Sequence, residues 1–173
     1  VGMLMFEALW KAAERGVRVR LLLDDGGTTG IDATLATLDA HPNIEVRLYN
    51  PFVQRGSRTL GYLSDFGRLN RRMHNKSFTA DNQLSVVGGR NIANEYFGAA
   101  GSIGFADLDV LVAGPVVQQV SAVFDLYWNS PSAYPAAPFV GPSPADPAAV
   151  LLPRFEAVPQ DPRAALYLEA VRQ

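Results

Sequence analysis

The hydrophobic pattern of the first fifty residues switches between a helical and a strand period. Apolar residues recur at helical spacing over residues 4–12, and Gly16 follows where such a helix would end. Residues 17–23 read as a strand that is apolar on both faces near its end, as expected for a covered sheet. A second helix is predicted over residues 31–40 and a second strand over residues 44–49. Strand, helix and strand in this order favour a parallel βαβ unit.

After an irregular stretch, the pattern predicts a hairpin, a short helix, a buried strand and a long amphipathic helix. These elements are expected over residues 73–80 with 83–87, 92–97, 108–113 and 114–128. Asp81-Asn82 supplies the turn of the hairpin. The last helix opens at Gly114-Pro115 and carries one apolar stripe that ends at Trp128. The fold class is therefore α/β.

The composition changes after Trp128. Nine of the twelve prolines fall between Pro131 and Pro162. This predicts a domain over residues 1–130, followed over residues 131–173 by a linker or extended arm rather than core. A last amphipathic helix is expected near the end of the arm, from Pro162 to Val171.

The overall composition excludes several classes of protein. With 173 residues and 48% hydrophobic residues, the chain can bury a real core. It has no cysteine, which excludes disulfides and thiolate chemistry, and its net charge of −2 argues against a general electrostatic grip on nucleic acid. No apolar run approaches the roughly 20 residues that span a bilayer. The chain starts inside a helix without an initiating Met, which indicates a truncated start.

A local excess of positive charge stands out against this average. Residues 47–76 contain a single acidic residue, Asp65, and seven basic ones. The basic residues are Arg47, Arg55, Arg58, Arg68, Arg71, Arg72 and Lys76. Such a stretch suits an anionic substrate or an anionic membrane surface. The alternative is a solvated loop with scattered arginines.

The basic stretch ends in a histidine and a lysine two residues apart. A strand would place His74 and Lys76 on one face. Displacement at a phosphodiester needs a nucleophile, neutralisation of the non-bridging oxygens and a proton for the leaving alkoxide. A neutral imidazole at His74 can attack phosphorus. Lys76 as a point charge and Asn91 as an amide donor can stabilise the negative charge on the phosphoryl oxygens.

Glycines and carboxylates complete this constellation. Gly88 and Gly89 have no side chains, so that their backbone amides can approach a phosphate closely. Asp107 and Asp109 share a strand face, and either can orient the histidine through its far ring nitrogen. Asp81 lies roughly 23 Å from His74 along the strand. We therefore interpret Asp81 as a structural residue of the hairpin turn.

Two other groups of polar residues could be functional sites, but a structural role is expected for both. Asp24-Asp25-Gly26-Gly27 could suggest a metal site, yet a loop at the end of a strand explains the same residues. His41 stands before Pro42 at a predicted helix end, where a capping or solvated role is expected.

The order His-x-Lys, four residues, Asp, six residues, Gly-Gly, one residue, Asn resembles the signature motif of the phospholipase D superfamily. The chain is similar to the bacterial cardiolipin synthase branch over about residues 1–135, and most specifically over residues 69–112. The resemblance implies a mixed β-sheet sandwiched between helices, with no metal or organic cofactor. It also implies that His74 is a catalytic histidine, that Lys76 and Asn91 bind phosphate, and that Asp107 orients an active-site histidine. Gly89 departs from relatives that carry Ser at this position, so one hydroxyl donor is absent.

A site of this family needs two histidines, and His41 matches no motif position. The second must come from another motif copy, in a second half of a longer protein or in a twin subunit. We expect the first option, with this chain as an N-terminal half whose first sheet strand is missing.

The resemblance implies a phosphatidyltransferase that works through a phosphohistidine, with phosphatidylglycerol or a similar phospholipid as substrate. The expected location is the bacterial cell membrane, with the protein peripheral or anchored by a segment outside this chain. One alternative is an endonuclease of the same superfamily that acts as a homodimer, although nucleic acid is not the expected partner. Another is a non-catalytic phospholipid-binding module.

Overall fold

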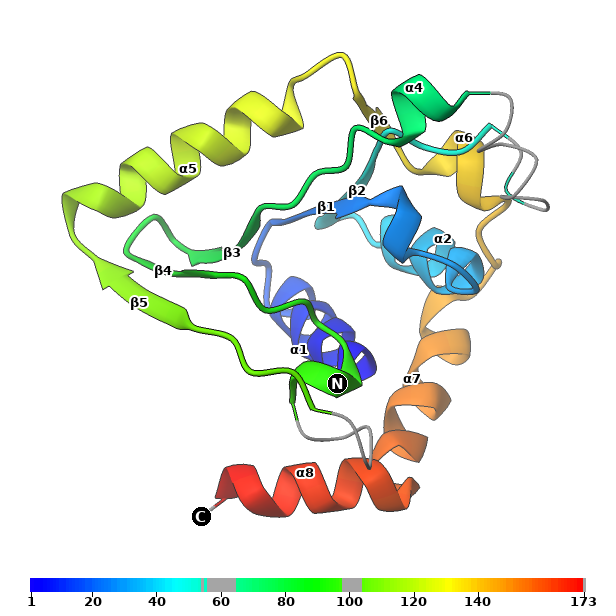
Figure 1. Ribbon diagram of the computed structural model, residues 1–173. Helices are drawn as coiled ribbons and strands as arrows, with labels where there is room; N and C mark the ends of the chain where they lie inside the picture. Colours follow the sequence, from blue (N-terminus) through cyan, green and yellow to red (C-terminus); the bar gives the residue numbers. More distant parts are fainter. Residues whose placement is uncertain (54, 56–64, 98–103, 173) are drawn as a thin grey trace. The chain divides into compact units, whose positions relative to one another are not determined.

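The computed structural model describes residues 1–53, 55, 65–97 and 104–172 (Figure 1). The chain divides into two compact units. The hairpin unit consists of Val1–Leu9, Asn75–Phe124 and Leu152–Gln173, and the βαβ unit consists of Trp10–His74 and Asp125–Leu151. Helix α1 (Gly2–Glu14) confirms the helix predicted at the start of the chain, and the division between the units falls within it, after Leu9.

The βαβ unit contains the predicted parallel strand pair. Strands β1 (Val19–Asp24) and β2 (Ile44–Tyr49) pair in parallel, and helix α2 (Asp32–Asp39) connects them. β6 (Ala133–Pro135) adds to the other edge of β2 in the antiparallel direction. Strand β2 alternates buried and less buried positions, and helix α2 buries most of its residues, so both elements line the interior of this unit. Its fully buried side chains include Leu35, Leu38, Val46 and Leu48.

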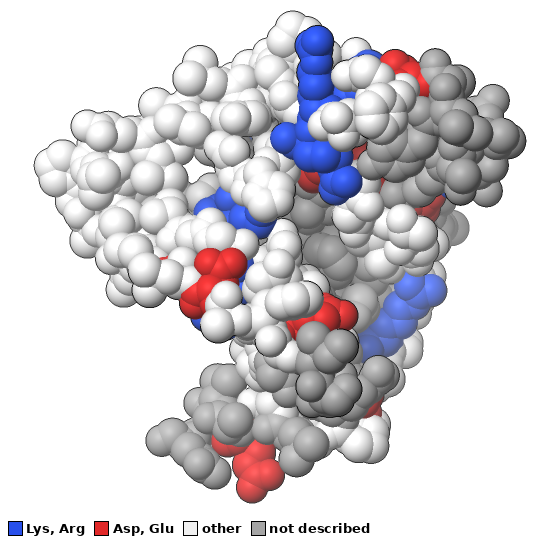
Figure 2. Space-filling model, in the orientation of Figure 1, with Lys and Arg blue, Asp and Glu red and all other residues white. Residues whose placement is uncertain are grey.

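Most of the basic stretch between residues 47 and 76 is neutralised inside the βαβ unit. The ion pairs are Arg47–Glu45, Arg55–Asp25, Arg55–Asp32, Arg68–Asp65 and Arg72–Asp24. Figure 2 shows basic and acidic side chains next to one another around helix α4 (Phe66–Leu69). Arg58 lies outside the described residues. Each of these four arginines therefore has a carboxylate partner, and that the stretch contacts an anionic partner stays a prediction.

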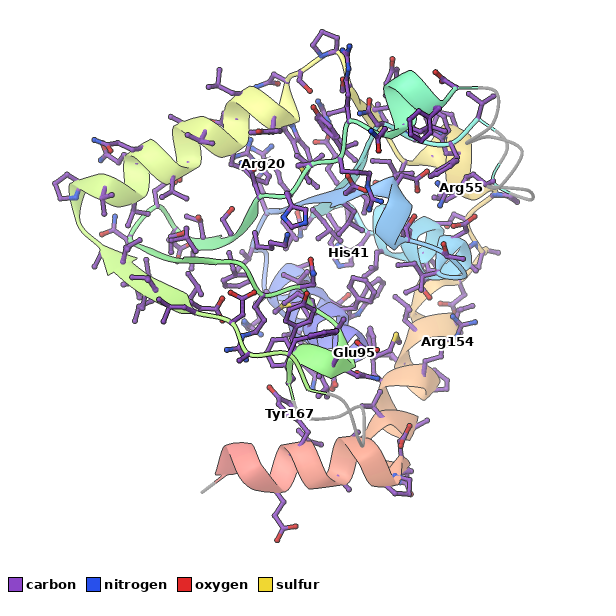
Figure 3. The ribbon with its side chains drawn as sticks, in the orientation of Figure 1. Arg20, His41, Arg55, Glu95, Arg154 and Tyr167 are labelled. Atoms are coloured by element: carbon purple, nitrogen blue, oxygen red, sulfur yellow. The ribbon has the colours of Figure 1, made fainter. Side chains whose placement is uncertain are left out.

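A buried carboxylate organises the loop that follows β1. Asp25 is fully buried and accepts hydrogen bonds from the hydroxyl of Thr28 (2.5 Å) and the backbone N–H of Phe52 (2.7 Å). Arg55, labelled in Figure 3, pairs with Asp25 and with Asp32. Burial opposes the charge of Arg55, but its hydrogen bonds to the carboxylates of Asp32 and Asp25 raise its pKa overall. These contacts support the loop interpretation of Asp24-Asp25. The part of the chain that the structure describes contains no group of three or more metal-ligating side chains.

His41 organises the turn between α2 and β2. Its Nδ1 accepts the backbone N–H of Asn43 (3.0 Å), and its Nε2 lies 3.1 Å from Oε1 of Glu14. Because Nδ1 accepts, Nε2 carries the proton and donates to Glu14. The ring also packs edge-on against Trp10, with 4.8 Å between centroids. His41 is therefore a buried structural residue, which supports the expected capping role rather than the solvated one.

The last turn of helix α5 (Pro115–Trp128) is fixed to the parallel strands through Trp128. The buried Trp128 ring lies 5.4 Å from the guanidinium carbon of Arg20 and 4.4 Å from that of Arg47. Arg47 donates to the carbonyl of Trp128 (2.8 Å), and Arg20 donates to Asp125 (2.7 Å). Cation–π contacts and charge-assisted hydrogen bonds thus act on the same turn.

The hairpin unit holds an antiparallel sheet in the order β3-β4-β5. Its strands are β3 (Lys76–Ala80), β4 (Leu84–Gly88) and β5 (Asp109–Ala113). Asp81 and Asn82 have φ values of 51° and 53°, and the N–H of Gln83 donates to the carbonyl of Ala80 (3.0 Å). This confirms the predicted turn, since Asp and Asn tolerate positive φ better than most residues. The predicted helix at residues 92–97 is only a 3₁₀ turn, η3 (Asn94–Tyr96).

The Pro-rich segment is not an extended arm. It forms β6, α6 (Ala137–Val140), α7 (Pro147–Ala157) and η4 (Val158–Gln160), and the predicted last helix follows as α8 (Pro162–Arg172). Val140, Leu151 and Phe155 are buried, and α6 contacts α2. The expectation that this segment lies outside the core is therefore wrong. Pro147 and Pro162 are the first residues of helices, where the N–H that proline lacks would have no partner within the helix. A high proline count therefore does not exclude helices in this segment.

Replacing His41 by Ala tests its structural role. The variant loses two hydrogen bonds and the contact with Trp10, so we expect the free energy of unfolding to fall by about 1–3 kcal/mol. The melting temperature of the full-length protein measures this loss. Activity per folded molecule should stay close to that of the wild type, and a catalytic defect in a well-folded variant would contradict the structural assignment.

Candidate active site

Lys76, Gly88 and Asp109 form a row across one end of the antiparallel sheet. Lys76 is the direct partner of Gly88, and Gly88 is the direct partner of Asp109. Directly opposite residues of antiparallel strands project to the same face. The side chains of Lys76 and Asp109 therefore leave the sheet on one side, separated by a residue without a side chain. Both are half-buried.

The two glycines are required by the close approach of the segment that contains Asp107 and Asp109. A Cβ atom on Gly88 would lie 2.1 Å from Oδ1 of Asp109 and 2.6 Å from the carbonyl oxygen of Leu108. A Cβ atom on Gly89 would lie 2.5 Å from Oδ1 of Asp107. The absence of side chains thus lets two carboxylates approach the backbone. Whether the amides of these glycines also face a phosphate stays a prediction.

Arg90 connects the loop after β4 with the residues that enter β5. Its Nε donates to Asp109 (2.7 Å), its Nη1 to the carbonyl of Tyr96 (2.8 Å) and its Nη2 to the carbonyl of Asp107 (3.3 Å). The guanidinium carbon also lies 5.2 Å from the centroid of the Phe97 ring. One rigid fork therefore fixes the backbone around Asp107 and the loop from which Asn91 projects.

Asn91 and Asp107 are exposed on this framework. The side-chain amide of Asn91 donates to the hydroxyl of Tyr96 (3.1 Å), and Oδ1 of Asp107 accepts the backbone N–H of Leu108 (2.8 Å). The hairpin unit thus brings Lys76, Gly88, Gly89 and Asp107 to one end of its sheet, and Asn91 follows two residues after Gly89. Arg90 and Tyr96 support this arrangement and were missed in the sequence. The position of Arg90 between Gly89 and Asn91 was the only available signal.

His74 belongs to the βαβ unit, and the division between the two units falls directly after it. It is exposed and lies in the irregular segment 71–75 before β3, which begins at Lys76. The predicted strand start at residue 73 is therefore wrong, and strand alternation does not place His74 beside Lys76. That His74 meets Lys76, Asn91 and Asp107 around one phosphoryl group stays a prediction.

Comparison with known sequences decides the family. The sequence model of the family described as "Cardiolipin synthase, PLD-like domain" matches residues 2–128. The chain belongs to this family. The match contains every predicted site residue, from His74 to Asp107, and the resemblance to the phospholipase D superfamily is confirmed.

Bacterial proteins are similar to this PLD-like domain. Cardiolipin synthase C of Escherichia coli K12 is 59% identical over 134 residues, which cover 78% of this chain and 28% of that protein. An uncharacterised protein of Helicobacter pylori 26695 is 42% identical over 70% of this chain and 24% of its own length. Cardiolipin synthase of Staphylococcus aureus Mu50 is 29% identical over 75% of this chain and 25% of its own length.

The PLD-like domain thus spans about a quarter of the length of these relatives. No helix among the described residues is both long enough and apolar enough to cross a bilayer. The expected α/β class is confirmed, with the strands divided between two three-stranded sheets.

Replacing Gly88 by Ala tests the close approach of β5. The new methyl group would meet backbone atoms of residues 108 and 109, so the strands must separate. We expect a loss of about 1–3 kcal/mol in the free energy of unfolding, together with reduced activity. Gly104→Ala is the matched control, because among the described residues its Cβ would meet just the carbonyl of Glu95, at 3.9 Å. Equal melting temperatures for the two variants would contradict the assignment.

Replacing Arg90 by Lys tests the fork. A lysine keeps the charge but cannot bind Asp109 and the carbonyls of Tyr96 and Asp107 together. We expect kcat to fall about tenfold, because Asn91 and Asp107 lose their support, while the overall fold persists. Steady-state kinetics measure the loss. Arg15→Lys is the control, because exposed Arg15 donates to the carbonyl of Lys11 at the end of its own helix (2.8 Å). Wild-type kcat in Arg90→Lys would remove the supporting role.

Proposed function

We propose that the protein to which this chain belongs is a phosphatidyltransferase of the cardiolipin synthase type. It transfers a phosphatidyl group between phospholipids through a phosphohistidine intermediate. The observation that carries this proposal is the complete motif His74, Lys76, Asp81, Gly88-Gly89 and Asn91 inside a chain of this family. The printed names of the relatives from E. coli and S. aureus, both cardiolipin synthases, agree with it.

In the first step, the imidazole of His74, or of its counterpart in a second motif copy, attacks the phosphorus of the donor lipid. A P–N bond forms, and the P–O bond to the headgroup alcohol breaks. The second histidine gives its proton to the leaving alkoxide, which departs as a neutral alcohol. Lys76 and Asn91 stabilise the charge on the non-bridging oxygens. Two observations support this assignment. Lys76 pairs directly with Gly88, and only Gly89 and Arg90 separate Gly88 from Asn91 in the sequence.

In the second step, the acceptor hydroxyl attacks the phosphohistidine. The second histidine, now neutral, accepts the hydroxyl proton, the new P–O bond forms and the P–N bond breaks, so both histidines return to their initial states. Asp107 acts as the carboxylate that orients one of the two rings. The proposed steps use no metal or organic cofactor, because the side chains supply the nucleophile, the proton and the compensating charge.

The donor in this proposal is phosphatidylglycerol or a similar phospholipid, and the acceptor is the hydroxyl of a second lipid. Water as the acceptor would give hydrolysis instead. The reaction then takes place at the surface of the bacterial cell membrane, with the protein peripheral or held by a segment outside this chain. The second histidine comes from a second motif copy, in the same protein or in a twin subunit.

The experiment replaces His74 by Ala in the full-length protein and follows labelled phosphatidylglycerol in vesicles. We expect transfer to fall by at least about 10³-fold, since no other group of the motif can take the place of the imidazole. His41→Ala is the matched control, because it removes an imidazole from the same unit and should leave transfer intact. Rapid denaturation of the wild-type reaction in detergent at mildly alkaline pH should also leave the labelled phosphatidyl group on a histidine, because the P–N bond is labile to acid and stable to base.

Near-normal turnover in His74→Ala would refute the proposal. Lipid binding by the wild-type protein without any turnover would favour the non-catalytic module instead. Cleavage of DNA that weakens steeply with salt, without lipid turnover, would favour the endonuclease.

A further inference from the structure

The segment that ends at His74 has little regular structure of its own. Helix α4 stops at Leu69, and residues 71–75 belong to neither a helix nor a strand. A reactive imidazole nevertheless needs a defined position, since a displacement of about 1 Å can cost about 10²-fold in rate. Something outside the segment must therefore fix its backbone.

The ends of the two parallel strands supply this support. Asp24 is the last residue of β1, and Asn50 follows directly after β2. Asp24 pairs with Tyr49 in the parallel register, so the carboxyl ends of both strands lie at one edge of the sheet. Residues 68–73 run over this edge and are bound by the side chains of both residues.

Asp24 uses both carboxylate oxygens on this segment and on its own loop. Oδ2 accepts the backbone N–H of Met73, the residue before His74, at 2.7 Å. Oδ1 accepts Nε of Arg72 at 2.6 Å and the backbone N–H of Gly26 at 3.0 Å. Only 13% of its side chain is exposed. A nearly buried carboxylate with three donors is held in one position, and it holds Met73 in turn.

Asn50 binds the same segment from the neighbouring strand. Its side chain is buried, and its amide donates to the carbonyl of Arg71 and, at 3.4 Å, to that of Arg68. The residue adopts a left-handed backbone conformation, with φ at 48°, and its own N–H is bound to the carbonyl of Ser132 (2.8 Å). The segment is thus held through carbonyls by Asn50 and through an N–H by Asp24.

Gly26 leaves the room that this arrangement needs. A Cβ atom there would lie 2.3 Å from the guanidinium carbon of Arg72. The three residues Asp24, Asp25 and Gly26 therefore each have a different structural role. Asp24 binds the segment before His74, Asp25 binds the loop that contains Arg55, and Gly26 admits the side chain of Arg72.

We propose that Asp24 is a positioning residue for His74, and that Asn50 assists it by fixing the backbone at Arg68 and Arg71. Asp24 acts through the peptide of Met73 and does not touch the substrate. The inference rests on the proposed function in one respect, because it takes His74 as a reacting group.

The experiment compares Asp24→Ala with Asp39→Ala in the full-length protein. Asp39 is the matched control, because its carboxylate also accepts one backbone N–H, that of Val46, at 2.7 Å, far along the chain from His74. Burial raises the pKa of the Asp39 carboxyl from its ordinary value, so both variants are assayed at the same pH. Melting temperature, kcat and KM are measured for both variants with labelled phosphatidylglycerol vesicles.

We expect Asp24→Ala to lower kcat by about 10–100-fold with KM changed less than about threefold, and Asp39→Ala to lower only the melting temperature. Asn50→Ala should show the same kinetic signature as Asp24→Ala, and it serves as the second variant if Asp24→Ala does not fold. Asp24→Asn keeps an acceptor for Met73 but loses the charge that holds Arg72, so it should recover part of kcat.

Wild-type kcat in folded Asp24→Ala and Asn50→Ala would overturn the proposal. Equal kcat losses in the Asp24 and Asp39 variants would do the same, because they would indicate a general loss of folded protein. The proposed function fails by a different result, normal transfer in His74→Ala. The two failures can therefore be told apart.

Discussion

The parallel pairing of β1 with β2 is the constraint on which the βαβ unit depends. The pair buries Val46 and Leu48 and sets the register in which Asp24 stands next to Tyr49. Because both strands run in one direction, their carboxyl ends present polar residues at the same edge. The loop of Asp25 and the segment before His74 are both attached to that edge. A change in register would therefore disturb the core and the candidate site together.

In the hairpin unit, two charged side chains lie at one end of the sheet with no side chain between them. Gly88 separates Lys76 from Asp109 in the cross-strand row. The missing side chains of Gly88 and Gly89 let β5 and its leading residues approach closely, and Arg90 compensates the charge of Asp109. The Gly-Gly pair therefore has a structural reason that is independent of any phosphate. A phosphate-binding role would add to this reason and would not replace it.

Several arginines of this protein pair with carboxylates of the same chain. Arg47, Arg55, Arg68 and Arg72 pair with carboxylates, and Arg47 also lies over the Trp128 ring. A count of basic residues along the sequence suggested a surface for an anionic partner. The count could not reveal the pairing, because partners such as Asp24 and Asp25 lie more than twenty residues away in sequence.

Much of the local structure followed from the sequence alone. Periodicity placed α1, β1, α2, β2 and α5, and the order of the elements indicated the parallel pair, since these choices depend on neighbouring residues. The motif also fixed the family, because its spacing is specific. Periodicity failed at residues 73–75, where Asp24 and Asn50 hold the chain in an irregular path, and in the Pro-rich segment, where burial of Leu151 and Phe155 outweighed composition. The roles of Asp24, Asn50, Arg90 and His41 were decided only by the tertiary structure, because each depends on a partner that folding brings close and that no local pattern announces.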